Sequence, residues 1–230
     1  MLVVSNLTVD YPDGTRAIDD VSFGVGPGEN VALIGANGAG KTTLLLALVG
    51  ILKAAAGDVS ACGSSLKSGD LRELRMRIGL VFQNPDDQLF MPDIYEDLAF
   101  GPRSMGIDET EIASRIANTL SCLGINHLAH RSPLKLSGGE KRSAAIAAVL
   151  TMAPEYLLFD EPTAYLDPKA KRRLIETFCS LPQGKLIATH DLAFAKALCS
   201  RVLLLQGGKL IADDGAQLFG DAAILEASGL

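Results

Sequence analysis

Short strand-like runs and longer helical runs follow one another along most of this chain of 230 residues. Residues 2–10 and 17–25 have the apolar content of strands, and the Pro-Asp-Gly run at 12–14 between them is a turn signal, so the pattern predicts an antiparallel hairpin. An apolar strand is predicted at 30–34, directly before a glycine-rich segment. The leucine-rich run that follows, at 41–52, predicts a helix.

The middle and second half of the chain continue this alternation. From residue 93 to about 152 the spacing is helical, with Ile112, Ile116, Leu120 and Leu123 on one face of a helix at 110–123. A polar, charged stretch separates the strands predicted at 58–61 and 78–82, and no element is assigned to it. Further strands are predicted at 156–159, 186–189, 202–205 and 209–212, and further helices at 141–152, 169–178 and 192–198. Strands that alternate with helices favour an α/β fold with a mostly parallel sheet.

Composition excludes several classes of protein. The formal net charge of −6 argues against nucleic acid as a partner, because phosphate backbones are bound by an excess of Lys and Arg. The four cysteines match no metal-binding spacing and indicate free thiols. We expect no secretory signal and no membrane span, since the apolar stretches are too short to cross a bilayer. The sequence therefore predicts a cytosolic protein whose membrane association would run through a partner.

Residues 35–42 fit the pattern G-x-x-x-x-G-K-[ST] between a strand and a helix. In that context glycines let backbone N–H groups approach phosphates, and the helix N-terminus adds a positive dipole end. We expect Lys41 to reach the β- and γ-phosphates of a nucleoside triphosphate, Thr42 to hold Mg²⁺ and Thr43 to touch the α-phosphate. The alternative is a glycine-rich turn without a ligand. The predicted contacts in this segment are Gly35, Asn37, Gly38, Gly40, Lys41, Thr42 and Thr43.

Polar side chains stand at the ends of three other predicted strands. Asp160 is placed for a second Mg²⁺ contact, and Glu161 is suited to polarise an attacking water. His190 lies on the ligand side of a parallel sheet, where it could contact the γ-phosphate or orient the water. Gln83 could reach the metal or the water. The alternatives are solvated acids, a structural histidine and a glutamine that caps a turn.

A second glycine-rich run at 136–140 precedes the helix predicted at 141–152. Ser137 can cap that helix, and Gly138 and Gly139 allow the backbone to approach an anion. One chain would then have two phosphate-binding helix ends and one magnesium site. We therefore predict that two chains share each nucleotide.

In order and spacing these segments resemble those of ATP-binding-cassette (ABC) ATPases over nearly the whole chain. In that family residues 35–42 are the Walker A motif, Asp160 and Glu161 close Walker B, and His190 is in the H-loop. The resemblance implies that Gln83 is in the Q-loop and that 164–167 is the D-loop, with a bulky Tyr165. It also implies that Tyr11 stacks on adenine and that Ser137, Gly138, Gly139 and Glu140, the signature motif, act on the nucleotide of the facing chain.

The family implies a P-loop NTPase core with an N-terminal antiparallel β-subdomain and an inserted helical subdomain. The expected division is 1–90 with 153–215 for the core, 91–152 for the helical signature subdomain and 216–230 for a short tail. It further implies a head-to-tail dimer, of identical or paralogous cassettes, in which ATP hydrolysis with Mg²⁺ drives a membrane transporter. The chain would then lie on the cytoplasmic face of the cell membrane.

Residues 82–90 and 96–102 resemble the ATPases of energy-coupling-factor importers, most of all the cobalt/nickel type. Vitamin uptake, such as that of biotin, and a soluble non-transport ABC ATPase remain alternatives. Asp86 and Asp87 lie beside the Q-loop, and we hypothesise that they receive a basic coupling helix of the membrane subunit. The alternative is a solvated acidic turn.

Overall fold

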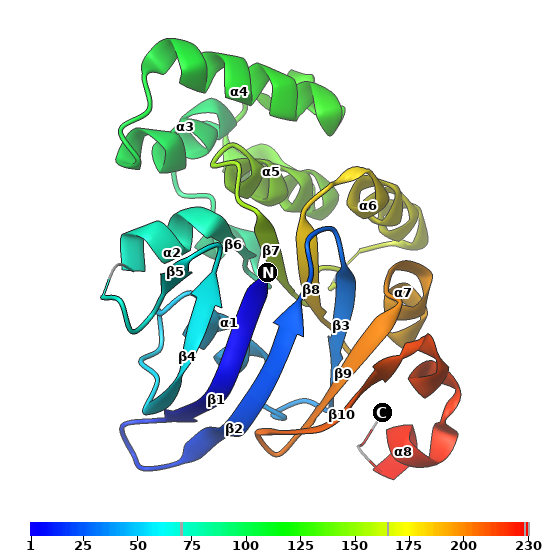
Figure 1. Cartoon of the computed structure of the whole chain (residues 1–230). Coiled ribbons are helices and arrows are strands. Elements are labelled where there is room, and N and C mark those ends of the chain that lie inside the picture. The colour runs from blue at the N-terminus through cyan, green and yellow to red at the C-terminus, as the bar shows by residue number, and fades with distance from the viewer. Residues whose placement is uncertain (70, 165, 228, 230) are drawn as a thin grey trace.

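A computed structural model describes residues 1–69, 71–164, 166–227 and 229 of the chain (Figure 1). The predicted D-loop residue Tyr165 lies outside them. The N-terminal hairpin is confirmed: two strands pair antiparallel and belong to a four-stranded sheet of order β2-β1-β4-β5. The strands of this sheet are β1 (Leu2–Asp10), β2 (Arg16–Val25), β4 (Ala56–Ala61) and β5 (Ser64–Ser65).

A six-stranded sheet of order β10-β9-β3-β8-β7-β6 forms the centre of the molecule. All its pairings are parallel except that of β10 with β9, so the predicted α/β class with a mostly parallel sheet is confirmed. The strands are β3 (Asn30–Ile34), β6 (Ile78–Val81), β7 (Tyr156–Asp160), β8 (Gly184–Ala188), β9 (Arg201–Gln206) and β10 (Lys209–Gly215).

The helices fill the space around this sheet (Figure 1). The helices α3, α4 and α5 gather at one end of the molecule, while α6 and α7 lie beside β8 and β9. Their bounds are α1 (Lys41–Leu48), α2 (Leu71–Arg77), α3 (Ile94–Ser104), α4 (Glu109–Cys122), α5 (Gly138–Leu150), α6 (Pro168–Ser180), α7 (Leu192–Leu198) and α8 (Ala222–Ala227), with short 3₁₀ turns at Pro85–Asp87, Asn126–Leu128, Pro133–Lys135 and Ala216–Gly220. The domain boundaries expected from the sequence stay a prediction.

The central sheet separates two hydrophobic cores, as the alternation along β3 shows. Val31 and Leu33 face a core shared with α1 and the four-stranded sheet. Ala32 and Ile34 face the opposite core, which α5, α6 and α7 help to form. Because both faces of β3 are covered, its five residues are almost continuously apolar, as is typical of a buried parallel strand. Loops at the carboxyl end of β3 therefore start from a rigid position.

Some element boundaries were predicted wrongly. The helix α1 ends at Leu48 instead of residue 52, because Gly50 takes a positive φ of 65° and the backbone turns away. The stretch to which no element was assigned contains α2, whose Leu74 is fully buried and whose Arg75 donates to the Val49 carbonyl. Within the described part of the chain, every helix is too short or too polar to cross a membrane.

Candidate nucleotide site

The carboxyl ends of five parallel strands, β3, β6, β7, β8 and β9, meet at one cleft of about 600 Å³. A cleft of this size accommodates a small-molecule ligand. Of the residues predicted to act on the nucleotide of their own chain, Gly35 alone does not line the cleft, whereas Gln83 and His190 do. The predicted lining residues are Tyr11, Asn37, Gly38, Gly40, Lys41, Thr42, Thr43, Gln83, Asp160, Glu161 and His190.

The glycine-rich loop after β3 is held tightly against its surroundings. A Cβ atom at Gly35 would lie 2.3 Å from the Leu205 carbonyl oxygen, so a side chain there would displace the loop from β9. Gly40 precedes α1 in the left-handed region, with φ of 106°. The Nζ of the buried Lys41 donates to the Gly35 carbonyl at 2.6 Å and to the Ala36 carbonyl at 3.2 Å. The loop thus wraps around a single ammonium group.

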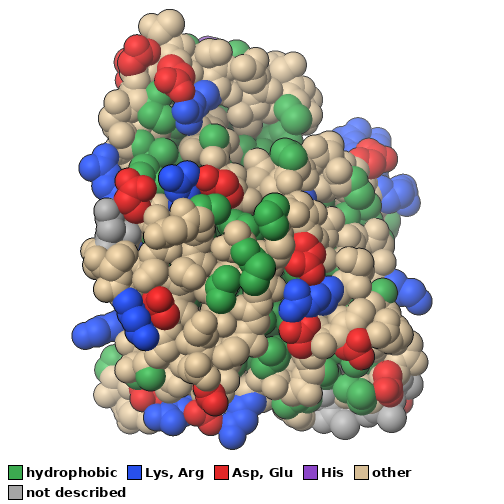
Figure 2. All heavy atoms as spheres, viewed as in Figure 1, with side chains coloured by type: hydrophobic (Ala, Val, Ile, Leu, Met, Phe, Trp, Pro, Cys, Tyr) green, Lys and Arg blue, Asp and Glu red, His purple; other side chains and the backbone are tan. Residues whose placement is uncertain are grey.

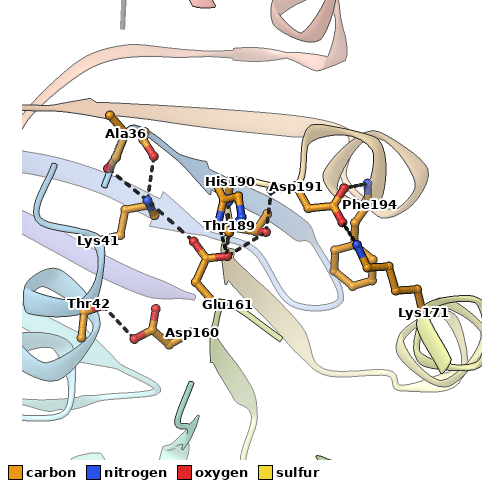
Figure 3. A network of polar contacts seen from close by, with 11 residues as sticks. Ala36, Lys41, Thr42, Asp160, Glu161, Lys171, Thr189, His190, Asp191 and Phe194 are labelled. Carbon is orange, nitrogen blue, oxygen red and sulfur yellow. Dashed lines mark hydrogen bonds and ion pairs between the residues drawn. The ribbon is translucent and has the colours of Figure 1, made fainter. Parts of the chain in front are cut away.

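A pair of oxygen-bearing side chains lies at the start of α1 and the end of β7. The Thr42 hydroxyl donates to Oδ2 of Asp160 at 2.8 Å (Figure 3). Burial raises the pKa of Asp160, an effect that this hydrogen bond partly offsets. The other oxygen, Oδ1, is buried and has no hydrogen-bond partner among the described residues. Mg²⁺ is commonly held by one or two oxygen side chains together with waters and phosphates, so Thr42 and Asp160 fit it.

The carboxylate of Glu161 lies between a lysine and a histidine (Figure 3). Its Oε1 is 3.7 Å from Lys41 Nζ, and its Oε2 is 2.9 Å from Nδ1 of His190. The same Oε2 accepts hydrogen bonds from the Thr189 hydroxyl at 3.2 Å and from the His190 backbone N–H at 3.3 Å. Glu161 is 6% exposed, so this carboxylate is held by its partners and screened from most solvent.

The backbone at Glu161 explains how two consecutive acids reach one cleft. In a regular strand, successive side chains point to opposite faces. Glu161 lies just beyond β7 and has φ of 43°, in the left-handed region that residues with a Cβ rarely adopt. This turn of the chain lets Asp160 and Glu161 line the same cleft.

Tyr11 lies in the turn between β1 and β2 of the N-terminal hairpin and lines the same cleft. Its hydroxyl is 2.7 Å from the hydroxyl of Thr43, and 39% of the residue is exposed. The ring therefore stands at the rim of the phosphate-binding loop. This position agrees with the expected stacking on a base, which stays a prediction.

The signature residues lie elsewhere on this chain. Ser137 caps α5 in a reciprocal capping box with Glu140, whose Oε2 accepts from the Ser137 N–H at 2.8 Å. Hydrogen bonds from Ser137 lower the pKa of Glu140. Gly138 has no atom within 4 Å of an added Cβ, so the start of the helix is open to an approaching group. None of the predicted signature residues lines the cleft described above.

Gln83 and the acidic segment after it are attached to α5. Arg142 donates from its guanidinium to the carbonyls of Phe82 at 2.8 Å and Gln83 at 2.6 Å. Asp86 and Asp87 belong to the 3₁₀ turn Pro85–Asp87, and the Asp86 carboxylate forms an ion pair with Lys141.

Two of these residues were missed by the sequence analysis. Thr189 could have been suspected, because it directly precedes His190 at the end of a predicted strand. Arg142 gave no such signal: a charged residue on a helix is usually at the surface, whereas this one is 2% exposed.

Residues 18–164 match the family model described as "ABC transporter". The chain belongs to the ABC transporter family. It is an ATPase domain of that family, which binds and hydrolyses ATP, so the resemblance inferred from the motifs is confirmed.

The names of two similar proteins point to particular types of ABC transporter. An energy-coupling factor transporter ATP-binding protein, EcfA, of Methanothermobacter thermautotrophicus is 42% identical, over 100% of this chain and 76% of the relative. The structure of cbiO1 from Clostridium perfringens, described as part of the ABC transporter complex cbiONQ, has a TM-score of 0.84 and 36% identity, covering 98% of this chain and 93% of that one. A dimeric bacterial ABC transporter cassette has a TM-score of 0.82 at 25% identity, covering 94% and 99%.

Proposed function

We propose that this chain binds ATP with Mg²⁺ and hydrolyses it to energise an energy-coupling-factor importer of cobalt or nickel ions. The observation that carries the enzymatic part is the convergence of Lys41, Thr42, Asp160, Glu161 and His190 on one cleft. The importer type is supported by the EcfA relative and the cbiO1 structure, together with residues 82–90 and 96–102.

In the proposed site each residue has a separate task. Lys41 leaves the carbonyls of Gly35 and Ala36 and binds the β- and γ-phosphates. It does so because negatively charged phosphates attract its ammonium group more strongly than neutral carbonyls do. Thr42 and Asp160, together with Gln83, would hold Mg²⁺, which would neutralise charge on the phosphates. Backbone N–H groups at Gly38 and Gly40 contact the phosphates.

Hydrolysis then requires a base beside the γ-phosphate. When Lys41 turns to the phosphates, Glu161 loses its lysine partner and keeps the hydrogen bonds from Thr189 and His190. Glu161 takes a proton from water as the water oxygen attacks the γ-phosphorus, and the bond from that phosphorus to the bridging oxygen breaks. His190 remains hydrogen-bonded to the carboxylate and orients it.

The signature turn completes the site of a second cassette. The N-terminus of α5 is exposed at Ser137 and Gly138 and lies outside the chain's own cleft. A head-to-tail dimer would place this helix end, with Gly139 and Glu140, on the γ-phosphate of the facing chain. The dimeric structure of a similar cassette supports this arrangement.

The Glu161→Gln variant tests the enzymatic and dimeric parts. The amide keeps the size of the side chain but cannot accept the proton, so ATP binding should persist while phosphate release nearly stops. A closed dimer should then accumulate with ATP and Mg²⁺, visible by gel filtration. Normal turnover by Glu161→Gln would refute the role of the base, and a monomer under these conditions would refute the shared site.

The cargo is tested in membranes. The tagged chain should co-purify with an integral membrane subunit, which would place it at the cytoplasmic face of the cell membrane. Vesicles containing that complex and internal ATP should accumulate labelled Co²⁺ or Ni²⁺. Uptake of a vitamin instead would keep the ATPase role and overturn the metal. Recovery without any membrane subunit would favour a soluble ABC ATPase.

We further propose that Asp87, with Asp86, contacts a basic segment of the membrane subunit. Asp86 is already paired with Lys141, which weakens its part in this contact. Asp87→Lys should therefore reduce co-purification with the membrane subunit and leave ATP binding unchanged. Glu176→Lys, a charge reversal at an exposed position of α6, is the matched control. Equal co-purification of both variants would refute the contact.

Nucleic acid is not a partner in this proposal. Lys and Arg side chains are interspersed with Asp and Glu on the face drawn in Figure 2, without a continuous basic stripe. Nucleic-acid-binding surfaces concentrate basic residues along the path of the backbone. The net charge of −6 points the same way.

A further inference from the structure

The first turn of α5 carries a carboxylate at the place where the proposed dimer has to bind a phosphate. Glu140 is the third residue of this helix, after Gly138 and Gly139, and its side chain is 30% exposed. The N-terminus of a helix attracts anions, but a phosphate that approaches this one also meets the negative charge of Glu140. The contacts that hold Glu140 therefore decide how readily this helix end accepts a phosphate.

One oxygen of Glu140 occupies both donors of the cap residue Ser137. Its Oε2 accepts from the Ser137 N–H at 2.8 Å and from the Ser137 hydroxyl at 2.7 Å. A hydroxyl has a single proton, so Ser137 cannot donate to a phosphate oxygen while it donates to Glu140. The exposed signature turn is thus occupied by its own capping box.

The other oxygen of Glu140 lies near two basic side chains of the segment 126–131. Its Oε1 is 3.7 Å from Nη1 of Arg131 and 3.9 Å from Nε2 of His127. Both distances exceed that of a hydrogen bond, so a rotation of the Glu140 side chain could shorten either. Arg131 is the stronger attractor, because a guanidinium is permanently charged and offers several donors in one plane. Arg131 can therefore take the carboxylate over from Ser137.

We propose that Glu140 blocks the signature turn in the free chain and moves to Arg131 when a phosphate binds there. The inference rests on the proposed function, because the phosphate belongs to the nucleotide of the facing chain. The phosphate repels the Glu140 carboxylate and accepts the hydrogen bond of the freed Ser137 hydroxyl. Opening the capping box costs free energy, so Glu140 weakens the nucleotide-dependent dimer, and Arg131 offsets part of that cost. Arg131 is thus a positioning residue that acts through Glu140.

The test is the dissociation constant of the ATP-dependent dimer, measured by sedimentation velocity. Every protein carries Glu161→Gln, so that hydrolysis does not reopen the dimer. Adding Glu140→Gln should lower the dissociation constant about tenfold, because an amide binds the Ser137 donors more weakly and does not repel a phosphate. Adding Arg131→Gln instead should raise it about tenfold, because Glu140 loses the guanidinium that receives it. Both side chains are partly exposed, so these variants should fold.

Combining the two substitutions distinguishes a positioning role of Arg131 from direct attraction of the phosphate. If Arg131 acts through Glu140, Arg131→Gln should have almost no effect once Glu140→Gln is present. The matched control is Arg115→Gln, which breaks an ion pair of the same type with Glu111 in α4 and should leave the dissociation constant unchanged.

Several outcomes overturn the inference. An unchanged or raised dissociation constant in Glu140→Gln does so, because the carboxylate would then not obstruct the signature turn. Equal weakening by Arg131→Gln with and without Glu140→Gln also does so, since Arg131 would then attract the phosphate directly. The same weakening by Arg115→Gln would reduce the result to a general effect of charge. Failure of Glu161→Gln itself to dimerise with ATP would instead refute the shared site of the proposed function.

Discussion

The hydroxyl of Thr189 lies 3.2 Å from the Oε2 of Glu161 and donates a hydrogen bond to it. Thr189 is fully buried at the end of β8, and its oxygen also accepts from the backbone N–H of Asp191. The buried hydroxyl therefore fixes the direction of the carboxylate, and the more exposed side chain of His190 contacts the same oxygen.

Thr189→Val should lower kcat for ATP hydrolysis by about tenfold and leave KM nearly unchanged. A hydrogen bond to a charged group is worth roughly 1.5–3 kcal/mol, and tenfold in rate corresponds to about 1.4 kcal/mol. Thr189→Ser keeps the hydroxyl and should restore most of the rate. Equal rates for the Val and Ser variants would show that the hydroxyl does not position Glu161.

Thr42→Val should raise the Mg²⁺ concentration needed for half-maximal ATPase activity by about tenfold or more, as loss of a supporting group at a metal site commonly does. It also leaves the buried carboxylate of Asp160 without its hydrogen bond from Thr42. Thr43→Val is the control, because its hydroxyl contacts Tyr11 instead. The two variants should be compared by Mg²⁺ titration; identical curves would contradict the assignment of Thr42.

Cysteine reactivity provides a check on the fold that does not depend on activity. Burial raises the pKa of the Cys199 thiol to about 12, whereas Cys62, Cys122 and Cys179 are exposed. Because the thiolate is the reactive form, iodoacetamide at pH 8 should label the three exposed cysteines and spare Cys199. Peptide mass spectrometry reads the sites directly. Rapid labelling of Cys199 in folded protein would mean that β9 and α7 do not pack as described.

Asp97 predicts a pH dependence of stability. It is 5% exposed, its Oδ1 accepts from the Phe90 and Met91 N–H groups, and burial raises its pKa above the ordinary 3.8. A raised pKa in the folded state means that folding favours the protonated acid, so this stabilisation is present below pH 3.8 and is lost as pH rises through the folded-state pKa.

Asp97→Asn isolates that contribution. The neutral amide still offers an oxygen to Phe90 and Met91 and does not titrate. Urea unfolding between about pH 3.5 and 6.5 should show the wild type losing stability relative to Asp97→Asn as pH rises. A constant difference between the two proteins across this range would contradict the burial argument.

The main features of the fold and of the single-chain site were predictable because they rest on local patterns. The glycine-rich loop lies between β3 and α1, and Asp160 and Glu161 lie at the end of β7. The hydrophobic period, the motif spacing and the strand ends gave clear signals at both places. The helix α2 was missed because it has one buried side chain, Leu74, and depends on contacts such as that of Arg75 with Val49.

The remaining features depend on distant contacts that no local pattern encodes. Arg142 is buried because Phe82 and Gln83, some sixty residues earlier, supply acceptors. The pairing of Asp86 with Lys141 likewise joins two segments far apart in sequence. The end of α1 is different: Gly50 is a helix-stop signal that the longer leucine-rich run obscured.

The left-handed backbone at Glu161 lowers the stability of the fold at the same position whose carboxylate is needed for activity. Glycine would adopt φ of 43° without the cost of about 1–2 kcal/mol that a Cβ incurs there. A search for more stable variants of this chain, in the laboratory or by sequence design, would therefore favour Glu161→Gly and remove the carboxylate. Loss of this strained residue would leave a stable cassette that holds ATP without hydrolysing it.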